Sequence, residues 1–556
     1  MSRHAISRGE KTAAGPARTR HRHRPPRPPA APADWLARLR QPHMRVYTRR
    51  WLTVSCGSLT LFMARFLLPS PVAMADNGDG PRLMCALGVA PVSGGHPRYD
   101  GFAYFTYEPS ASCANAPVYP SSEHLLLAAA RDLTPLLGLP GTVSLIAVGL
   151  ITCGLQSAGI ASLACGLRLR WRSTVLLAAA LWLIMADASF FDTYAGPYSE
   201  GAALTGLLLV AAGVVYLGRD TLGFAFGLLL TAAGGYLAVL SKEQYVLLAI
   251  PVCGVIVAAS ASRSRTGLAR LLTARVAAAT LMAGLLAAGA VGYARHEAGS
   301  PYAATMHQEQ AVNVIFQDIV NGHDDATADL RALGLPASWA RYAGTSFWAP
   351  RTVYHDPLYR RYAGRLTDGT VVGFLLTHPA DLVSTGQRAA DGALQLRVDY
   401  LGSYQPGSGH PAGALEDRVT VLTSLVQAIP AGLGLVWLLP LWAAMGAIAA
   451  RALRTARHAP AWHRDAAFVL ALLIGCAITA FVPAAYLDGL GITRHMLGSN
   501  LATALGFVVA ALLLGAMVRD GMAAGAAGDH AGPAEPVIVP RQAAAGSLTG
   551  AGIPPG

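Results

Sequence analysis

The sequence predicts an all-α polytopic membrane protein, with about ten transmembrane helices and a mainly helical extracytoplasmic domain. Hydrophobic residues make up 53% of the 556 residues and charged residues only 13%, which argues against a water-soluble globular fold. Runs of about 17 to 25 mostly apolar residues recur, and each is long enough to cross a bilayer as a helix. Arginines collect in alternate short loops between these runs, as expected for a chain that threads back and forth through a membrane.

The apolar runs divide the chain into an N-terminal transmembrane region, 51–293, and a C-terminal one, 423–517. The expected spans lie near residues 51–75, 141–166, 173–190, 201–217, 222–240, 245–260, 274–293, 423–450, 466–487 and 497–517.

Residues 1–50 precede the first run and are rich in Arg, Pro and His. Such a composition buries too little apolar surface to fold, so we expect a disordered basic cytoplasmic arm. It is not a signal peptide, because the apolar run after it is too long and starts too far from the N-terminus. Residues 518–556, rich in Ala, Gly and Pro, are expected to form a disordered cytoplasmic tail.

The formal net charge of +12 raises the question of nucleic-acid binding. The arginines lie in the arm and in short loops, which favours orientation in a bilayer instead. With the arm in the cytoplasm, alternation of the spans brings every Arg-rich short loop to that side; these loops carry Arg168, Arg170, Arg172, Arg263, Arg265, Arg270, Arg275, Arg451, Arg454, Arg457 and Arg464. We therefore expect a multi-pass plasma-membrane protein with both termini cytoplasmic and no nucleic-acid partner.

The opposite side of the membrane then receives a first outer loop, 76–140, and a long segment, 294–422. The long segment is large enough for a small domain. Apolar residues at helical spacing from Val312 to Ile319, and Pro379 at the start of another periodic run, predict a mainly helical domain resting on the membrane region.

Of the seven cysteines, five lie within apolar runs and are expected to pack as small hydrophobic side chains, because no Cys-x-x-Cys or Cys/His spacing suggests a metal. Cys85 and Cys113 share the first outer loop. A disulfide between them and two free thiols both remain open interpretations.

The stretch Ala75-Asp76-Asn77-Gly78-Asp79-Gly80 lies where the first apolar run ends. A carboxylate at that boundary is partly desolvated, which raises its pKa and makes it a better proton acceptor. Asp76 and Asp79 are therefore candidate catalytic bases, and their spacing would also suit one substrate or one divalent cation. A solvated turn that ends a helix explains the pair equally well.

A second polar stretch, Phe191 to Glu200, places two acids and two tyrosines between two spans. Tyrosine rings stack on sugars and carboxylates orient their hydroxyls, so Asp192, Tyr194, Tyr198 and Glu200 are candidate substrate-binding residues. Interfacial tyrosines and a helix start at Glu200 would produce the same pattern.

Lys242 is one of only two lysines in the chain and lies at an expected outer boundary, where it could contact a phosphate. Arg494 and His495 lie in the last outer loop, where a cation is costly unless it meets an anion such as a lipid-linked phosphate. The structural alternative for Lys242 is an ion pair with Glu243. The alternative for Arg494 and His495 is snorkelling to the lipid head groups. Arg65, inside the first run, is expected to have an internal partner and no catalytic role.

Several short motifs follow one another along the chain and lie on one expected face of the membrane. They are Ala75–Asp79, Tyr194–Glu200, Ser241-Lys242, Asn313-x-x-Phe316, Leu333-Gly334-Leu335-Pro336, His378-Pro379, Tyr400-Leu401-Gly402 and Arg494-His495. Together they resemble the GT-C superfamily of integral-membrane glycosyltransferases, and more narrowly the bacterial hexose transferases of cell-surface (S-layer type) glycan biosynthesis. The similarity runs from about residue 51 to 517. Gly80-Pro81 departs from the family's pattern, in which a bulkier residue is expected after the second Asp.

The resemblance implies transfer of a hexose from a polyprenyl-phosphate-linked donor to a cell-surface glycan or another extracytoplasmic acceptor. It makes Asp76 or Asp79 the base that deprotonates the acceptor hydroxyl, and it gives the departing lipid phosphate to Lys242, Arg494 and His495. The Tyr-Ser-Glu motif would orient the sugar or the acceptor. No particular cofactor is implied; the paired acids permit a divalent cation but do not require one.

Two other classes of protein are consistent with the composition. A transporter or flippase for a lipid-linked or anionic solute would place charges near the bilayer midplane, in broken helices of matching repeats. Here the charges gather at one surface and no repeat is evident. A non-catalytic assembly protein built around the outer domain would use the same motifs structurally. The leading hypothesis is a polyprenyl-phosphate-dependent glycosyltransferase.

Overall fold

The computed structural model describes residues 42–92, 100–262, 274–321 and 325–530. Within these residues, 8 helices are long and apolar enough to cross a membrane, and a bent pair raises the number to 9. The predicted all-α polytopic fold is therefore confirmed. The eight are α5 (Leu145–Gly166), α8 (Glu200–Leu217), α9 (Thr221–Val239), η4 (Glu243–Leu248) with α10 (Ala249–Ala261), α11 (Ala274–Ala298), α18 (Gly434–Thr455), α19 (Ala461–Tyr486) and α21 (Leu497–His530).

The bent pair occupies the third predicted span. Helix α6 (Trp171–Met185) is followed by α7 (Ala188–Phe191) and the short helix η3 (Asp192–Ala195), and the direction changes by 56°. Asp187 lies in the bend and caps α7, because its side chain accepts a hydrogen bond from the backbone N–H of Ser189.

The first predicted span, 51–75, differs from what the structure contains. Helix α2 (Pro42–Leu67) begins within the residues expected to form the basic arm and ends at Leu67. Helix α2 is long enough to cross a membrane, but it is not among the 8 apolar helices counted above, since it carries several arginines, among them Arg65. Residues 68–79 have no regular secondary structure. The sequence suggested that Asp76 lies at the end of a membrane helix. In the structure, an irregular stretch separates Asp76 from the end of α2.

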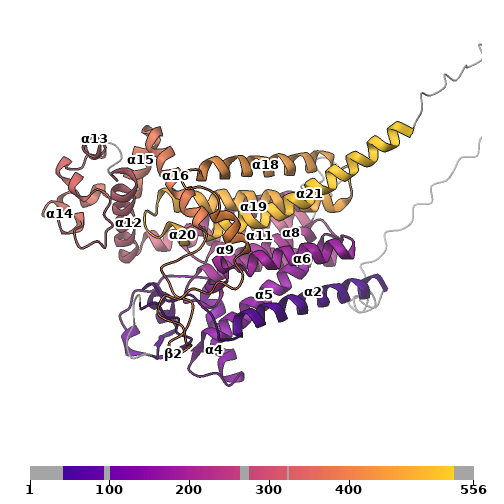
Figure 1. Cartoon of the computed structure of the whole chain (residues 1–556), viewed down its shortest axis with the longest axis horizontal. Coiled ribbons are helices and arrows are strands. Elements are labelled where there is room, and N and C mark those ends of the chain that lie inside the picture. The colour runs from indigo at the N-terminus through magenta and orange to yellow at the C-terminus, as the bar shows by residue number, and fades with distance from the viewer. Residues whose placement is uncertain (1–41, 93–99, 263–273, 322–324, 531–556) are drawn as a thin grey trace, which may run out of the picture. The chain divides into compact units, whose positions relative to one another are not determined.

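The long helices run alongside one another, with α8 at the centre (Figure 1). Every residue of α8 is buried, and it packs against α5, α9 and α19. Glycines permit the closest of these contacts, since a Cβ atom at Gly206 would lie 2.5 Å from the carbonyl oxygen of Gly234 on α9. This packing holds Glu200, the first residue of α8, at one end of the helices.

A helical unit with its own core adjoins that same end (Figure 1). Phe316, Leu330, Trp339 and Phe374 are among its buried side chains. The unit confirms that the first part of the long segment is helical. It contains α12 (Pro301–Asn313), the π-helix η6 (Val314–Ile319), α13 (Ala326–Ala332), η7 (Ala337–Tyr342), η8 (Val353–His355), α14 (Tyr359–Tyr362), η9 (Ala363–Arg365) and α15 (Asp368–Thr377). Helix α16 (Pro379–Gln395) packs on α18 and α19 and also contacts α15 and η6 of the unit.

The first outer loop folds into a small sheet with short helices. The strands are antiparallel in the order β1-β2-β3, with Ala90 opposite Glu108. Cys85 and Cys113 form a disulfide with a Cα–Cα distance of 4.9 Å, which decides between the two interpretations left open by the sequence. The elements are α3 (Gly80–Met84), η1 (Cys85–Leu87), β1 (Val89–Pro91), β2 (Thr106–Pro109), η2 (Ala111–Cys113), α4 (Glu123–Leu136) and β3 (Val143–Ser144).

The remaining cysteines agree in part with their expected role. Cys153, Cys165 and Cys476 are buried, Cys253 is half-buried, and Cys56 is exposed on α2. At the C-terminal side, α21 continues into the expected tail as far as His530. The rest of that tail and residues 1–41 of the arm lie outside the described residues.

The last part of the long segment, 396–420, returns to the irregular stretch after α2. The backbone N–H of Ala73 donates to the carbonyl of Ser403 (3.1 Å), and that of Ala75 donates to Gly402 (2.8 Å). The N–H of Met74 donates to the carbonyl of Asp192 at 2.8 Å. This segment therefore holds in place the chain that leads to Asp76.

Arg65 has the internal partner expected from its position in an apolar run. Its guanidinium pairs with the buried carboxylate of Glu416, and its Nε donates to the carbonyl of Ala186 at 2.6 Å. Arg418 also contacts Glu416, with Nε and Oε1 2.6 Å apart. These contacts connect α2, the bend after α6 and the returning segment.

We predict that Arg65→Met lowers the free energy of unfolding by about 1.5–3 kcal/mol, because it removes one of the two arginines that pair with the buried Glu416 carboxylate. Removing both charges in Arg65→Met/Glu416→Met should cost less than the single change. Denaturant unfolding in detergent measures both. Arg131→Met, whose partner Asp132 is exposed, is the control and should change stability little. A double variant less stable than Arg65→Met would contradict this account.

Candidate functional site

The site begins with a tight turn that Asp76 organises. Its Oδ1 accepts hydrogen bonds from the backbone N–H groups of Gly78 (2.7 Å) and Gly80 (2.9 Å). The Oδ1 of Asn77 accepts another from Asp79 at 3.2 Å. Asx turns of this kind are a typical use of Asp and Asn. One oxygen of the Asp76 carboxylate therefore supports the backbone that presents Asp79.

The glycine at position 80, where the resemblance led us to expect a bulkier residue, has a steric explanation. A Cβ atom at Gly80 would lie 2.5 Å from Oδ2 of Asp76 and 2.7 Å from its Cγ. The Asp76 carboxylate occupies the space that a bulkier side chain would need. In this chain the turn closes because position 80 has no side chain.

Tyr198 supports the same turn through hydrogen bonds of its hydroxyl group. Its hydroxyl donates to the carbonyl of Ala75 (2.5 Å) and accepts from the N–H of Asn77 (2.8 Å). The side chain is buried, and burial, together with the nearby Asp76 carboxylate, raises its pKa well above the ordinary value. It therefore remains a neutral hydrogen-bond donor. The Arg494 guanidinium lies over its ring, 5.2 Å from the centroid.

Asp79 is ion-paired on both oxygens. Its Oδ2 lies 2.6 Å from Nη2 of Arg494, and its Oδ1 lies 3.3 Å from Nη1 of Arg82. Burial pushes the pKa of this carboxyl up, but the charges of Arg494, Lys242 and Arg82 outweigh burial and hold the pKa well below its usual range. Asp79 is therefore ionised and, while these pairs persist, a weak proton acceptor.

Glu200 is the second anion of the cluster. Its Oε1 lies 3.5 Å from Nζ of Lys242 and 3.6 Å from Nε of Arg494. It is the first residue of α8, where the positive end of the helix dipole favours a carboxylate. Only 2% of Glu200 is exposed, so these two cations balance its charge.

His495 connects the cations. Its Nε2 lies 3.2 Å from Nζ of Lys242 and 3.2 Å from Nη2 of Arg494, and its Nδ1 contacts the Asp488 carboxylate. Burial lowers the pKa of His495 below its ordinary value although Asp488 opposes this. The neutral ring with its proton on Nδ1 satisfies both sides, because Nε2 then accepts from the cations and Nδ1 donates to Asp488.

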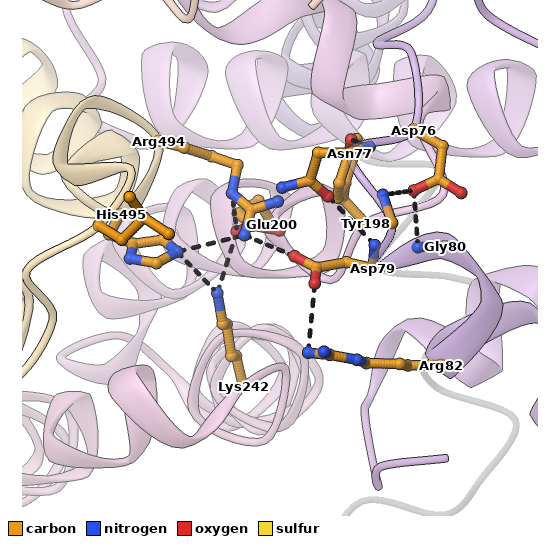
Figure 2. Close-up of polar contacts among 12 residues, drawn as sticks. Asp76, Asn77, Asp79, Gly80, Arg82, Tyr198, Glu200, Lys242, Arg494 and His495 are labelled. Carbon is orange, nitrogen blue, oxygen red and sulfur yellow. Dashed lines mark hydrogen bonds and ion pairs between the residues drawn. The ribbon is translucent and has the colours of Figure 1, made fainter. Parts of the chain in front are cut away.

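Figure 2 shows these side chains converging from four separate parts of the chain. Asp79 precedes α3, Glu200 begins α8, Lys242 precedes η4, and Arg494 and His495 lie on α20 (Ile492–His495). Arg494 and Asp79 are 415 positions apart in the sequence. Five of the residues selected from the sequence thus lie in one contacting cluster, with Asp76 and Tyr198 supporting the turn beside it.

The cluster leaves strong hydrogen-bonding groups unused. Arg494 is only 5% exposed, yet its Nε and Nη1 have no hydrogen-bond partner within the described part of the chain. The same holds for Oε1 of Glu200, whose contacts are the longer ion pairs above. A buried guanidinium with two free donors is unusual without a ligand, and its geometry suits a phosphate or carboxylate.

Asp192 and Tyr194 do not join the cluster. The Asp192 carboxylate accepts a hydrogen bond from Oγ of Ser403, and the Tyr194 hydroxyl is directed to Sδ of Met185 at 3.9 Å. Both are buried in the contacts that hold the returning segment and the bend. Their expected role as substrate-binding residues stays a prediction, and the contacts that the structure shows for them are with neighbouring protein groups.

Two charged members of the cluster were not selected from the sequence. Arg82 follows Asp79 at a spacing of three residues, which on the helical turn at α3 brings opposite charges together; that spacing was a usable signal. Asp488 carried no comparable signal, because its contact with His495 depends on how the loop between α19 and α20 folds.

A metal site was left open by the sequence. Among residues 42–92, 100–262, 274–321 and 325–530, no group of three or more His, Cys, Asp or Glu side chains could hold a metal ion. Asp76 and Asp79 direct their carboxylates into different contacts, one into the turn and one to the arginines.

The fold and the cluster define a polytopic α-helical membrane protein with a buried, ion-paired site at one end of its helices. The chain belongs to the family of the YfdI N-terminal transmembrane domain, whose model matches residues 44–512. No curated protein and no solved structure matches the chain.

We predict that Tyr198→Phe destabilises the protein by about 1–3 kcal/mol, because it leaves the Asn77 N–H and the Ala75 carbonyl without their buried partner. Thermal unfolding in detergent measures the change. Tyr354→Phe, an exposed tyrosine in the helical unit, is the matched control and should shift the midpoint little. Equal stability of Tyr198→Phe and Tyr354→Phe would show that the hydroxyl does not support the turn.

Proposed function

We propose that this protein is a membrane glycosyltransferase that moves a hexose from a polyprenyl-phosphate donor to an extracytoplasmic acceptor such as a cell-surface glycan. The observation that carries the proposal is the buried Arg494, which pairs with the ionised Asp79 and contacts His495 beside Lys242. Two of its guanidinium nitrogens make no hydrogen bond within the described residues. Such a site suits a phosphate next to a potential base. Membership of the YfdI family, a GT-C-like membrane glycosyltransferase family, supports the same activity.

In the proposed reaction, donor binding and activation of the base are one event. The donor phosphate attracts Arg494, Lys242 and Arg82, which in its absence neutralise Asp79 and Glu200. As those cations turn toward the phosphate, they stabilise Asp79 less, so its pKa rises toward the ordinary range. Asp79 then becomes a competent proton acceptor only when the donor is present.

The transfer step follows from this arrangement. The acceptor hydroxyl gives its proton to Asp79 while its oxygen bonds to the anomeric carbon of the donor. The bond from that carbon to the phosphate oxygen breaks, and the electron pair leaves with the lipid phosphate. Arg494 and Lys242 stabilise the charge that grows there. Asp76 acts as a positioning residue, because its carboxylate holds the turn that carries Asp79.

A cavity of about 650 Å³ beside α16, a helix that packs on α20, would give the acceptor room. Asp391, Gln395, Arg397 and Thr420 are among its lining residues. Gln395 also accepts a hydrogen bond from Oγ1 of Thr493, 2.9 Å away, and Thr493 precedes Arg494. Amide, carboxylate and hydroxyl groups of this kind suit a sugar-rich acceptor.

We place the cluster on the extracytoplasmic side. A disulfide between Cys85 and Cys113 suits an oxidising compartment. The opposite ends of the helices are arginine-rich: Arg219 donates to the carbonyl of Gly166 and Arg275 to that of Arg219, as expected for a cytoplasmic face.

A transporter remains the alternative from another class, since the bend after α6 is a broken span. The acid in that bend is engaged by the protein, however. Asp187 accepts from the backbone N–H of Ser189 and from that of Leu422 at 2.8 Å. Asp187 therefore serves the fold, which favours the enzyme.

We predict that Asp79→Asn lowers hexose transfer by about 10²- to 10⁴-fold, the usual contribution of a general base. The assay follows radiolabelled hexose from undecaprenyl-phosphate glucose, or other undecaprenyl-phosphate hexoses, into membrane glycans. Asp132→Asn, a change at an exposed acid in the first outer loop, is the matched control. Normal transfer by Asp79→Asn at normal expression, with any donor that the parent protein uses, would reject Asp79 as the base.

We predict that an exposed residue of the helical unit is accessible from outside the cell and an exposed residue of the opposite loop is not. Arg360→Cys and Arg457→Cys, both at exposed positions, are compared in a Cys56→Ser background. A membrane-impermeant maleimide should label the first in intact cells and the second only after permeabilisation. The reverse pattern would overturn the orientation.

A further inference from the structure

A groove between two membrane helices begins at the segment that follows Lys242. It has a volume of about 510 Å³ and is lined by η4 and α10 on one side and α11 on the other. The lining residues are Val246, Leu247, Ala249, Ile250, Cys253, Ala287, Ala290, Val291, Ala294, Arg295 and Ala298. All but Arg295 are apolar or a free thiol.

The shape of the groove follows from the sequence of α11. Alanines at 287, 290, 294 and 298 repeat at helical spacing and leave a trough where larger side chains would fill the gap to α10. From Ala287 to Ala298 the helix rises roughly 16 Å at about 1.5 Å per residue. The groove narrows where the helices meet, since Sγ of Cys253 donates to the carbonyl of Ala283 at 3.2 Å.

Helix η4 connects the groove to the proposed phosphate site. Lys242, which contacts Glu200 and His495, is the N-cap residue of η4, and Val246 is four positions further on. Arg295 lines the groove near the C-terminal end of α11, at the same end of the helices. An amphiphile with one anionic head and one long apolar chain would suit this arrangement, with its head at the cations and its chain in the apolar groove.

We infer that this groove holds the polyisoprenoid chain of a lipid phosphate whose head binds Lys242 and Arg494. The inference rests on the proposed function and extends it to a site for the carrier. In a bilayer an apolar groove by itself gains little from exchanging one lipid chain for another. Selectivity for a polyprenyl phosphate must therefore come from the cations at the charged end of the groove. It must also come from a groove width that suits one chain better than the two chains of a phospholipid.

Photocrosslinking tests the inference without requiring sugar transfer. The full chain is reconstituted in phosphatidylcholine nanodiscs with a polyprenyl phosphate that carries a diazirine in its first isoprene units. Crosslinks should map to 246–253 and 287–298. Unlabelled undecaprenyl phosphate should compete at about tenfold lower concentration than undecaprenol or phosphatidic acid, because only it combines one chain with a phosphate. Equal competition by phosphatidic acid, or crosslinks spread over other helices, would overturn the inference.

A pair of matched variants tests the position of the chain. Ala294 and Ala288 are both exposed on α11, but only Ala294 lines the groove. Ala294→Trp should reduce crosslinking about tenfold by filling the trough, and Ala288→Trp should leave it unchanged. Equal crosslinking in both variants would also overturn the inference. Lys242→Gln should abolish the preference for undecaprenyl phosphate over undecaprenol; a preserved preference would remove Lys242 from the phosphate site.

The outcomes separate this inference from the function on which it rests. Crosslinking in the groove without any detectable hexose transfer would retain the lipid site and reject the enzyme. Transfer that depends on Asp79, without crosslinking in the groove, would retain the enzyme and reject the lipid site.

Discussion

The ion pair between Asp79 and Arg494 is the constraint on which the site depends. It joins the first outer loop to the last, across 415 positions of sequence, and it brings Arg494 beside Glu200 and His495, both of which also contact Lys242. Buried charges are costly unless each has a partner. The cluster therefore exists only while the helices and loops that supply its members are correctly packed, and α8, buried along its whole length, is the element around which they pack.

The same pairing gives the site its proposed chemistry. A carboxylate held between two arginines is ionised but weakly basic, and a guanidinium with unused donors attracts a further anion. A ligand phosphate satisfies the arginine and releases the carboxylate from its partners. Binding and reactivity are then coupled through one set of charges, so the site does not need a base whose pKa is permanently raised by burial. The structure departs here from the expectation formed on the sequence, because the charges around Asp79 outweigh its desolvation.

Residues of the same type, close in sequence, have different roles in the structure. Asp192 and Glu200 belong to one polar stretch, yet Asp192 binds Ser403 in the packing of the returning segment and Glu200 faces Lys242. Asp76 and Asp79 divide in the same way, one supporting a turn and one forming ion pairs. No pattern in the sequence separates these cases, because the partners come from segments far away in the chain. Arg65 was interpreted correctly for a general reason: a cation within an apolar run must find an internal anion.

The sequence alone determined the membrane class, most of the helices and the face on which the polar motifs gather. These depend on transfer free energies of local segments, which composition and spacing record directly. The tertiary structure alone decided where α2 ends, that Cys85 and Cys113 are bonded, and which acids meet which cations. Those outcomes are pairwise contacts between distant segments, and their energies do not exist until the chain is folded.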